Sequence, residues 1–174
     1  LGGIGRIKVG AATETELKDK KLRYEDALNS VKSAIEMGVV PGGGATLLSL
    51  AEDAALKKEV FAACGKDEDV RLGAEIIFRS LAAPMRQIAM NAGLDGSVVV
   101  DKCRRQQFGF GYNALTNTYE DMIKSGVLDP AKVTINALEN AASIAGMVLT
   151  TEVLVTEIPK EQNAPPMSNN YDME

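Results

Sequence analysis

The sequence predicts a mainly α-helical fold with short β-strands, for three reasons. First, the 174 residues include four Tyr, four Phe and no Trp, so the core must consist largely of small aliphatic side chains. Such side chains favour closely packed helices over a β-sandwich. Second, apolar residues recur every three or four positions in several long segments. Third, glycines and prolines divide these segments at regular intervals.

The first long helix is predicted after a short glycine-rich strand over residues 2–9. Thr13 followed by Glu16 has the pattern of a capping box at a helix start, and Gly38 is a suitable stop. Residues 39–41 should then be extended. The apolar stripe of this helix consists of Tyr24, Leu28, Val31 and Ile35.

The middle of the chain predicts several shorter helices. One should start directly after Gly44, and the charged stretch 57–69 should contain a loop. Another helix is expected over about 70–81. Because proline lacks an amide donor but suits a first helical turn, Pro84 should begin a new helix that ends near residue 92. Ser97 should cap one more helix, through Arg105.

The last third predicts two strands and two helices. Aromatic residues alternate with glycines over 108–112, which is strand spacing with one bare face. A short helix is expected over 119–124. Asp129 should cap a long helix over 130–151, with Pro130 at its first position. Residues 153–158 are rich in β-branched side chains and predict a final strand.

Composition excludes several classes of site. The chain has no histidine, which removes Ser-His-Asp and Cys-His catalysis and histidine-based zinc sites. Cys64 and Cys103 form no CxxC motif, so a reduced compartment is the simpler interpretation, with a single disulfide left open. A net charge of −5 gives no electrostatic reason to bind nucleic acid or an anionic membrane. No apolar run approaches the roughly 18 residues of a membrane span.

The run Gly42, Gly43 and Gly44 is the first candidate for ligand binding. It lies between an extended segment and a helix start, where free amides and the helix dipole favour an anion. Glycines also let a ligand approach the backbone closely. No Gly-Lys-Ser/Thr follows, so this is not a P-loop. On these residues alone, a flexible turn is the favoured interpretation.

Three further candidates remain open on pattern alone. Asp26 projects about 200° from Tyr24 at helical spacing, so it is either a solvated carboxylate or one that orients water for attack on a phosphate. Asp129 is either a helix cap or an acceptor for ribose hydroxyls. Residues 109–114, including Asn113, form either a strand and tight turn or a surface against a nucleotide base.

Taken in order along the chain, five segments closely resemble the group I chaperonins, the 60-kDa GroEL family. They are IKVGAATETELKDKK, YEDALNSVKSAIEMGVVPGGGATLL, APMRQIAMNAG, GYNALTNTYEDMIKSGVLDPAKVT and ALENAASIAGMVLTTEVLVTEIP. The resemblance implies that residues 1–36 belong to the intermediate domain and residues 37–159 to the C-terminal part of the equatorial ATP-binding domain. Residues 160–174 are expected to be a disordered tail. Because the chain starts at Leu1 rather than Met, we expect it to lie within a longer protein.

The resemblance also implies a site. Asp26 corresponds to the aspartate that promotes ATP hydrolysis, and Arg86 and Asp95 to positions of contact between stacked rings. No metal ligand is expected here, because the phosphate loop and the magnesium carboxylates belong to the N-terminal equatorial half. The residues expected around the nucleotide are Gly42, Gly43, Gly44, Ile88, Tyr112, Asn113, Ala114, Val127 and Asp129.

The implied function is ATP-dependent assistance of protein folding and refolding, with ATP and Mg²⁺ as cofactors. The implied partners are further copies in stacked rings, and unfolded proteins and a co-chaperonin bound through an apical domain, in a bacterial cytoplasm or plastid stroma. Leu115 departs from the alanine of the bacterial pattern, and the tail lacks Gly-Gly-Met repeats. The alternative is that this segment by itself is a non-catalytic helical oligomerisation module without ATPase activity.

Overall fold

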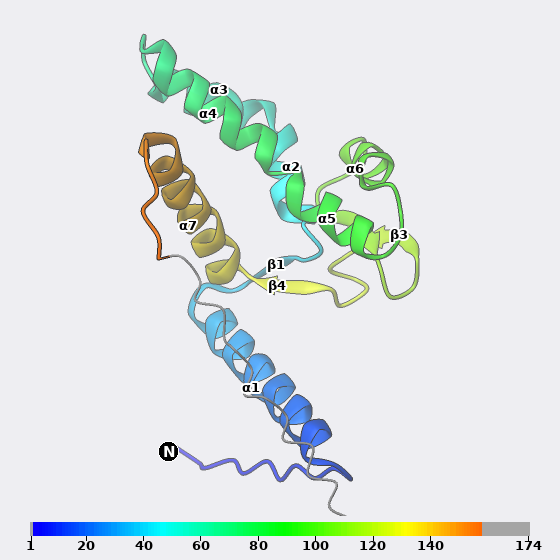
Figure 1. Ribbon diagram of the computed structural model, residues 1–174. Helices are drawn as coiled ribbons and strands as arrows, with labels where there is room; N and C mark the ends of the chain where they lie inside the picture. Colours follow the sequence, from blue (N-terminus) through cyan, green and yellow to red (C-terminus); the bar gives the residue numbers. More distant parts are fainter. Residues whose placement is uncertain (1, 158–174) are drawn as a thin grey trace, which may run out of the picture.

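The computed structural model describes residues 2–157 and confirms a mainly helical fold with short strands (Figure 1). Within this part of the chain there are seven helices and four strands. The helices are α1 (Glu14–Met37), α2 (Ala45–Glu52), α3 (Ala54–Ala63), α4 (Glu68–Ser80), α5 (Ala83–Asn91), α6 (Gly96–Arg104) and α7 (Ala131–Thr150). The strands are β1 (Val39–Pro41), β2 (Phe110–Asn113), β3 (Thr118–Asp121) and β4 (Leu128–Pro130).

Helix α1 begins and ends as predicted. The Thr13 hydroxyl accepts the Glu16 N–H at 3.2 Å, and the Glu16 carboxylate accepts the Ala12 N–H at 3.3 Å. At the other end, Gly38 has φ 81°, a conformation that favours glycine. The predicted strand over residues 2–9 is wrong, because these residues are not in strand conformation and pair with no strand among the described residues.

Strands β1 and β4 join two distant parts of the sequence. They pair antiparallel, with Val40 opposite Asp129. The Ala131 N–H continues the ladder by donating to the Gly38 carbonyl at 3.0 Å. The prediction that Asp129 caps the last helix is therefore wrong. Asp129 lies within a strand, and Pro130, in an extended conformation, occupies the N-cap position of α7.

The loop predicted within 57–69 is present but short, because two aspartates start the helices that flank it. The Asp53 carboxylate accepts the N–H groups of the first turn of α3, and Asp67 does the same for α4. The rings of Phe61 and Phe78 then pack with centroids 5.9 Å apart and hold α3 against α4. Only residues 64–67 form a turn between the two helices.

Helix α5 has Pro84 in its first turn, as predicted. The cap of α6 is not Ser97 but Asp95, whose carboxylate accepts the Ser97 N–H at 2.8 Å. The strand predicted over 108–112 is β2, which begins at Phe110. The helix predicted over 119–124 is wrong. Strand β3 lies there instead, because residues 118–121 pair with β2 in a hairpin.

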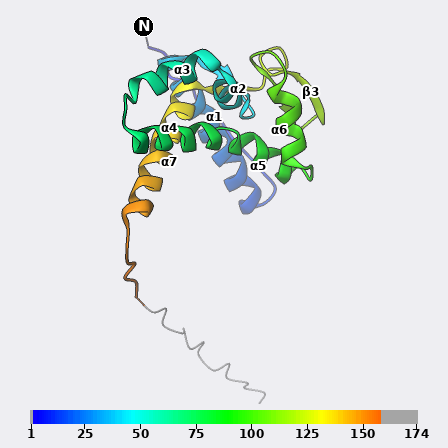
Figure 2. The same ribbon diagram turned by 90° about the horizontal axis from the view of Figure 1, so that it is seen from above.

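The buried core lies between α2, α5, α6 and the β2–β3 hairpin. It consists of Ala45, Leu48, Ala82, Met85, Ala89, Val99, Val100, Cys103, Tyr112 and Met122. Helices α1 and α7 have no buried residue, and α7 projects from the body of the molecule (Figure 2). Both cysteines are free.

The predicted strand over 153–158 is not formed by its described residues 153–157, which are exposed and unpaired with any strand of residues 2–157. Ile158 and the tail predicted over 160–174 lie outside the described residues.

The packing at Gly44 generates a stability prediction. A Cβ on Gly44 would lie 2.7 Å from the Met85 backbone nitrogen, and φ there is +77°. Gly44→Ala should therefore cost about 3 kcal/mol of unfolding free energy, from backbone strain plus overpacking. Gly65→Ala is the matched control, because φ is +66° but nothing lies within 4 Å. It should cost about 1 kcal/mol. Equal losses in urea denaturation would contradict the packing argument.

Candidate functional site

The three glycines form a tight turn, here called the glycine turn (Gly42–Gly44), between β1 and α2. The Gly42 N–H donates to the Val127 carbonyl at 2.9 Å. A Cβ on Gly42 would lie 3.1 Å from the Val127 carbonyl oxygen and 3.2 Å from an Asp129 carboxylate oxygen. Three residues that the sequence assigned to a nucleotide site, Gly42, Val127 and Asp129, are thus in direct contact.

The other two glycines pack against buried methionines. A Cβ on Gly43 would lie 3.1 Å from Met122 Cε, and one on Gly44 would meet the Met85 backbone. Both glycines have φ in the left-handed region, at 65° and 77°. Protein neighbours therefore account for each glycine of the turn. The turn leads directly into α2, whose first N–H groups have no partner within the helix.

Asp129 supplies a carboxylate at the edge of this turn. It is half-buried, and desolvation by burial raises its pKa. Its side chain has no hydrogen-bond or ion-pair partner among residues 2–157. A partly desolvated carboxylate without such a partner is a suitable acceptor for ligand hydroxyl groups.

The β2–β3 hairpin lies on another side of the turn. The Tyr112 carbonyl oxygen is 3.7 Å from the position of a Cβ on Gly43. Asn113 is only 8% exposed, and its amide is already engaged, donating to Glu120 at 2.8 Å and accepting the Leu115 N–H at 3.0 Å. Ala114 is exposed at the start of the hairpin loop. The Asn113 amide therefore stabilises the hairpin, in addition to any contact with a ligand.

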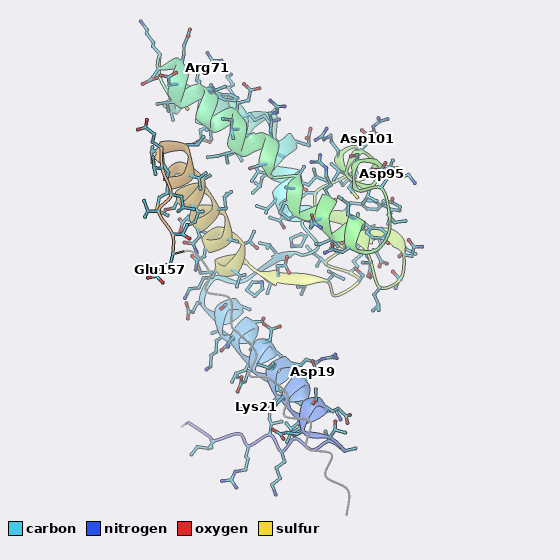
Figure 3. The ribbon with its side chains drawn as sticks, viewed as in Figure 1. Asp19, Lys21, Arg71, Asp95, Asp101 and Glu157 are labelled. Carbon is cyan, nitrogen blue, oxygen red and sulfur yellow. The ribbon has the colours of Figure 1, made fainter. Side chains whose placement is uncertain are left out.

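Asp26 is not part of this cluster. It is exposed on α1, about 16 Å along the helix axis from Met37 at an ordinary helical rise. Figure 3 shows Asp19 and Lys21 of α1 on the opposite side of the molecule from Asp95 and Asp101 of α6. The Asp26 side chain has no hydrogen-bond or ion-pair partner within residues 2–157.

The two predicted ring-contact residues lie on neighbouring elements. A Cβ on Gly96 would lie 2.5 Å from the Arg86 carbonyl oxygen, so the start of α6 packs closely against α5. Arg86 and Asp95 are both exposed, and no ion pair joins them in the described structure. Ile88, on α5, is partly buried. None of these three residues contacts the glycine turn through a described interaction.

A groove with a volume of about 730 Å³ lies elsewhere, among α2, α3, α4 and α6. It is lined by side chains of both charge signs, including Glu52, Lys57, Arg71 and Glu75. Within residues 2–157, no three His, Cys, Asp or Glu side chains form a group that could hold a metal ion. In the same part of the chain, no helix is long and apolar enough to cross a membrane.

Sequence reasoning missed two residues around the turn, Met85 and Met122. Both are almost completely buried, at 1% and 0% exposure. Neither stands in a pattern that distinguishes it from ordinary core methionine. The sequence feature that points to them is the pair of glycines, Gly44 and Gly43, whose missing side chains leave room for Met85 and Met122 respectively.

Comparisons with known proteins agree with the resemblance. The model of the TCP-1/cpn60 chaperonin family matches residues 2–159. The RuBisCO large subunit-binding protein subunit alpha, chloroplastic, of Pisum sativum is 55% identical over 163 residues, covering 94% of this chain and 27% of the relative. Its counterpart in Brassica napus is 55% identical over 159 residues, covering 91% and 28%. This chain therefore spans little more than a quarter of these relatives.

The fold also matches a solved structure, that of a group III chaperonin in the open state. The TM-score is 0.67 and the sequence identity 29%. The alignment covers 88% of this chain and 32% of that chain. The similarity in structure therefore extends over nearly the whole of the described fold.

The raised pKa of Asp129 predicts a pH dependence of stability. Because burial raises the folded-state pKa above the unfolded value, the ionised carboxylate destabilises the fold at neutral pH. This penalty disappears as pH falls below the unfolded pKa. Asp129→Asn should therefore be more stable than the parent chain at pH 7, and the difference should shrink toward acid pH.

Asp121 is the matched control, because its pKa is shifted in the opposite direction. The Lys124 N–H, followed by other contacts that include the Ile123 N–H, lowers its pKa. Asp121→Asn should thus lose stability at neutral pH, and this loss should vanish as pH falls through the folded pKa. Urea denaturation of both variants between pH 3 and pH 8, a range chosen to span ordinary carboxyl pKa values, tests the pair. If both substitutions changed the unfolding free energy at pH 7 in the same direction, the opposite pKa shifts of Asp129 and Asp121 would be refuted.

Proposed function

The chain belongs to the TCP-1/cpn60 chaperonin family, and from this premise we propose that it acts as part of an ATP-dependent chaperonin that assists protein folding and refolding. The prediction of a chaperonin is confirmed at the level of the family. The observation that carries the proposal further is the glycine turn with the half-buried Asp129 carboxylate beside Gly42. Together they offer the Gly43 and Gly44 backbone amides for phosphate oxygens and an acceptor for ribose hydroxyls.

The residues present fit a nucleotide. The absence of side chains at the glycine turn leaves its backbone open to a ligand on any side not filled by Val127, Met122 or Met85. In the proposal, Gly42–Gly44 bind phosphate groups, Asp129 orients the sugar, and Val127 with Tyr112–Ala114 and Ile88 lie toward the base. Bound ATP supplies the phosphoanhydride, and Mg²⁺ neutralises its charge. No residue of this chain is assigned to the metal.

Asp26 is proposed as the catalytic carboxylate, which orients the attacking water. Its separation from the glycine turn requires α1 to move relative to β1 before it can act. The junction can accommodate this, because Gly38 has φ +81° and nothing lies within 4 Å of a Cβ placed there. Hydrolysis would then wait on closure of the hinge, as in other enzymes whose catalytic site is completed by a conformational change.

The wider assignments follow from the family. We propose that residues 1–36 form an intermediate-domain segment and residues 37–159 the C-terminal part of an equatorial domain. The proposed partners are further copies in stacked rings, unfolded proteins and a co-chaperonin. Arg86 and Asp95 are exposed on adjacent elements and are proposed to contact the opposite ring. The relatives from two plants are described as chloroplastic, which favours the plastid stroma over a bacterial cytoplasm.

A second candidate function is assembly without catalysis. The apolar stripe identified on α1 is exposed, with Tyr24 at 49%, Leu28 at 52%, Val31 at 57% and Ile35 at 79%. Along α7, Ile144, Met147 and Val148 are exposed to between 54% and 67%. Exposed apolar surface of this extent favours self-association.

The catalytic assignment predicts a selective effect of Asp26→Ala. In the full-length subunit that carries these residues, ATP hydrolysis should slow at least about a hundredfold, because a positioned acid–base group contributes that much. ATP affinity should change little, since Asp26 reaches the nucleotide only after closure. The matched control is Asp19→Ala, about two turns earlier on the same face of α1. This variant should hydrolyse ATP normally. Equal rates for both variants would contradict the role of Asp26.

The assembly alternative predicts the behaviour of the 174-residue chain alone. It should show no measurable ATP turnover, because its sequence has no phosphate loop. In sedimentation velocity its average mass should rise with concentration. Leu28→Ser with Val31→Ser should reduce this rise, whereas Lys21→Ser, exposed on the same helix, should leave it unchanged. A monomer at every concentration would count against assembly, and ATP turnover abolished by Asp26→Ala would contradict the inactive state.

A further inference from the structure

Met122 lies directly beneath the glycine turn and is completely buried, at 0% exposure. Its Cε is 3.1 Å from where a Cβ on Gly43 would stand, and 2.9 Å from the same position on Gly111. Its Cγ is 3.0 Å from that Gly111 position. The side chain therefore occupies a gap that exists only because both neighbours lack a side chain. One glycine belongs to the turn and the other to strand β2.

Backbone hydrogen bonds also link Met122 to the glycine turn. The Met122 N–H donates to the Gly109 carbonyl at 2.9 Å, and the Val127 N–H donates to the Met122 carbonyl at 2.8 Å. The Val127 carbonyl in turn accepts the Gly42 N–H at 2.9 Å. Gly109 in turn packs against Pro41, which precedes the turn: a Cβ on Gly109 would lie 3.3 Å from Pro41 Cγ. Met122 is therefore joined to the glycine turn through its backbone and through its side chain.

The shape of methionine suits this place. An unbranched thioether can pass between two backbones, whereas leucine carries a branch at Cγ, the atom that lies 3.0 Å from where a Cβ on Gly111 would stand. Truncation to alanine would leave Gly43 without a neighbour on that side. Gly43 has φ +65°, a conformation that glycine adopts without strain, so loss of this neighbour would leave the turn free to shift. The length of this side chain thus contributes to the separation between the turn and the hairpin, together with the approach of Gly109 to Pro41.

We propose that Met122 is a positioning residue for the nucleotide site. It fixes the distance between the glycine turn, which would bind phosphates, and the β2–β3 hairpin, which would face the base. The inference rests on the proposed function, because it gives the turn and the hairpin one common ligand. Met122 does not touch that ligand. It acts through Gly43 on one side and Gly111 on the other.

The test compares ATP affinity in the full-length subunit that carries these residues. Met122→Ala should weaken ATP binding by about tenfold, since small displacements of positioning groups are costly, and should raise KM while kcat stays nearly constant. Gly111→Ala should have a similar effect, because its new Cβ would push Met122 toward Gly43. In the double variant the added methyl partly refills the space left by Met122→Ala. Affinity should then return to within about threefold of the parent, a coupling that independent sites would not show.

Val99→Ala is the matched control for general loss of packing. Val99 is buried to 1% exposure on α6 and contacts no residue of the glycine turn through a described interaction. The Val99→Ala substitution should lower thermal stability without changing ATP affinity. If Met122→Ala behaves like Val99→Ala, or if the effects of Gly111→Ala and Met122→Ala simply add, Met122 is an ordinary core residue and the inference is refuted. Absence of ATP binding by the unsubstituted subunit would instead refute the proposed function itself.

Discussion

The pairing of β1 with β4 is the constraint on which the rest of the structure depends. It places Val40 opposite Asp129 and is continued by the bond from the Gly42 N–H to the Val127 carbonyl. Without it, the glycine turn and Asp129 would belong to unconnected parts of the chain. The same pairing sets the direction in which α1 leaves the strand at one end and α7 at the other. A short ladder of backbone hydrogen bonds thus determines both the candidate site and the two exposed helices.

Glycine is required around this ladder for reasons of space. Gly42 faces a carbonyl and a carboxylate, Gly44 faces the backbone of α5, and Gly96 faces the Arg86 carbonyl. At each point two backbones approach more closely than any Cβ would allow. Such packing makes the region rigid, because a close-packed contact cannot deform gradually. A ligand bound at the turn would therefore meet a preformed backbone rather than a flexible loop.

The buried core excludes four of the seven described helices, α1, α3, α4 and α7, none of which has a buried residue. The core lies entirely around α2, α5, α6 and the hairpin, while α1 and α7 have no buried residue. Helix α1 is held by its capping interactions and by i,i+4 ion pairs such as Lys18–Glu14. It also contacts α7 and β4, and its Glu36 pairs with Lys132 of α7. Surface pairs of this kind contribute little to stability. Because α1 has no buried residue, its movement about Gly38 would break few buried contacts, which is the physical basis for the proposal that Asp26 moves toward the turn.

The sequence by itself determined the helical class, the limits of α1, the start of α5 at Pro84 and the family. These features depend on helix caps, proline and motifs that consist of residues close together in the sequence. Tertiary structure decided the strand identity of residues 118–121 and of Asp129, since each depends on a partner distant in space. It also decided that the stripe on α1 is exposed, because apolar spacing specifies a face but not what covers it. The role of Met122 depended on tertiary structure most of all. Its position between two glycines arises from contacts among three segments, and no local pattern records such a gap.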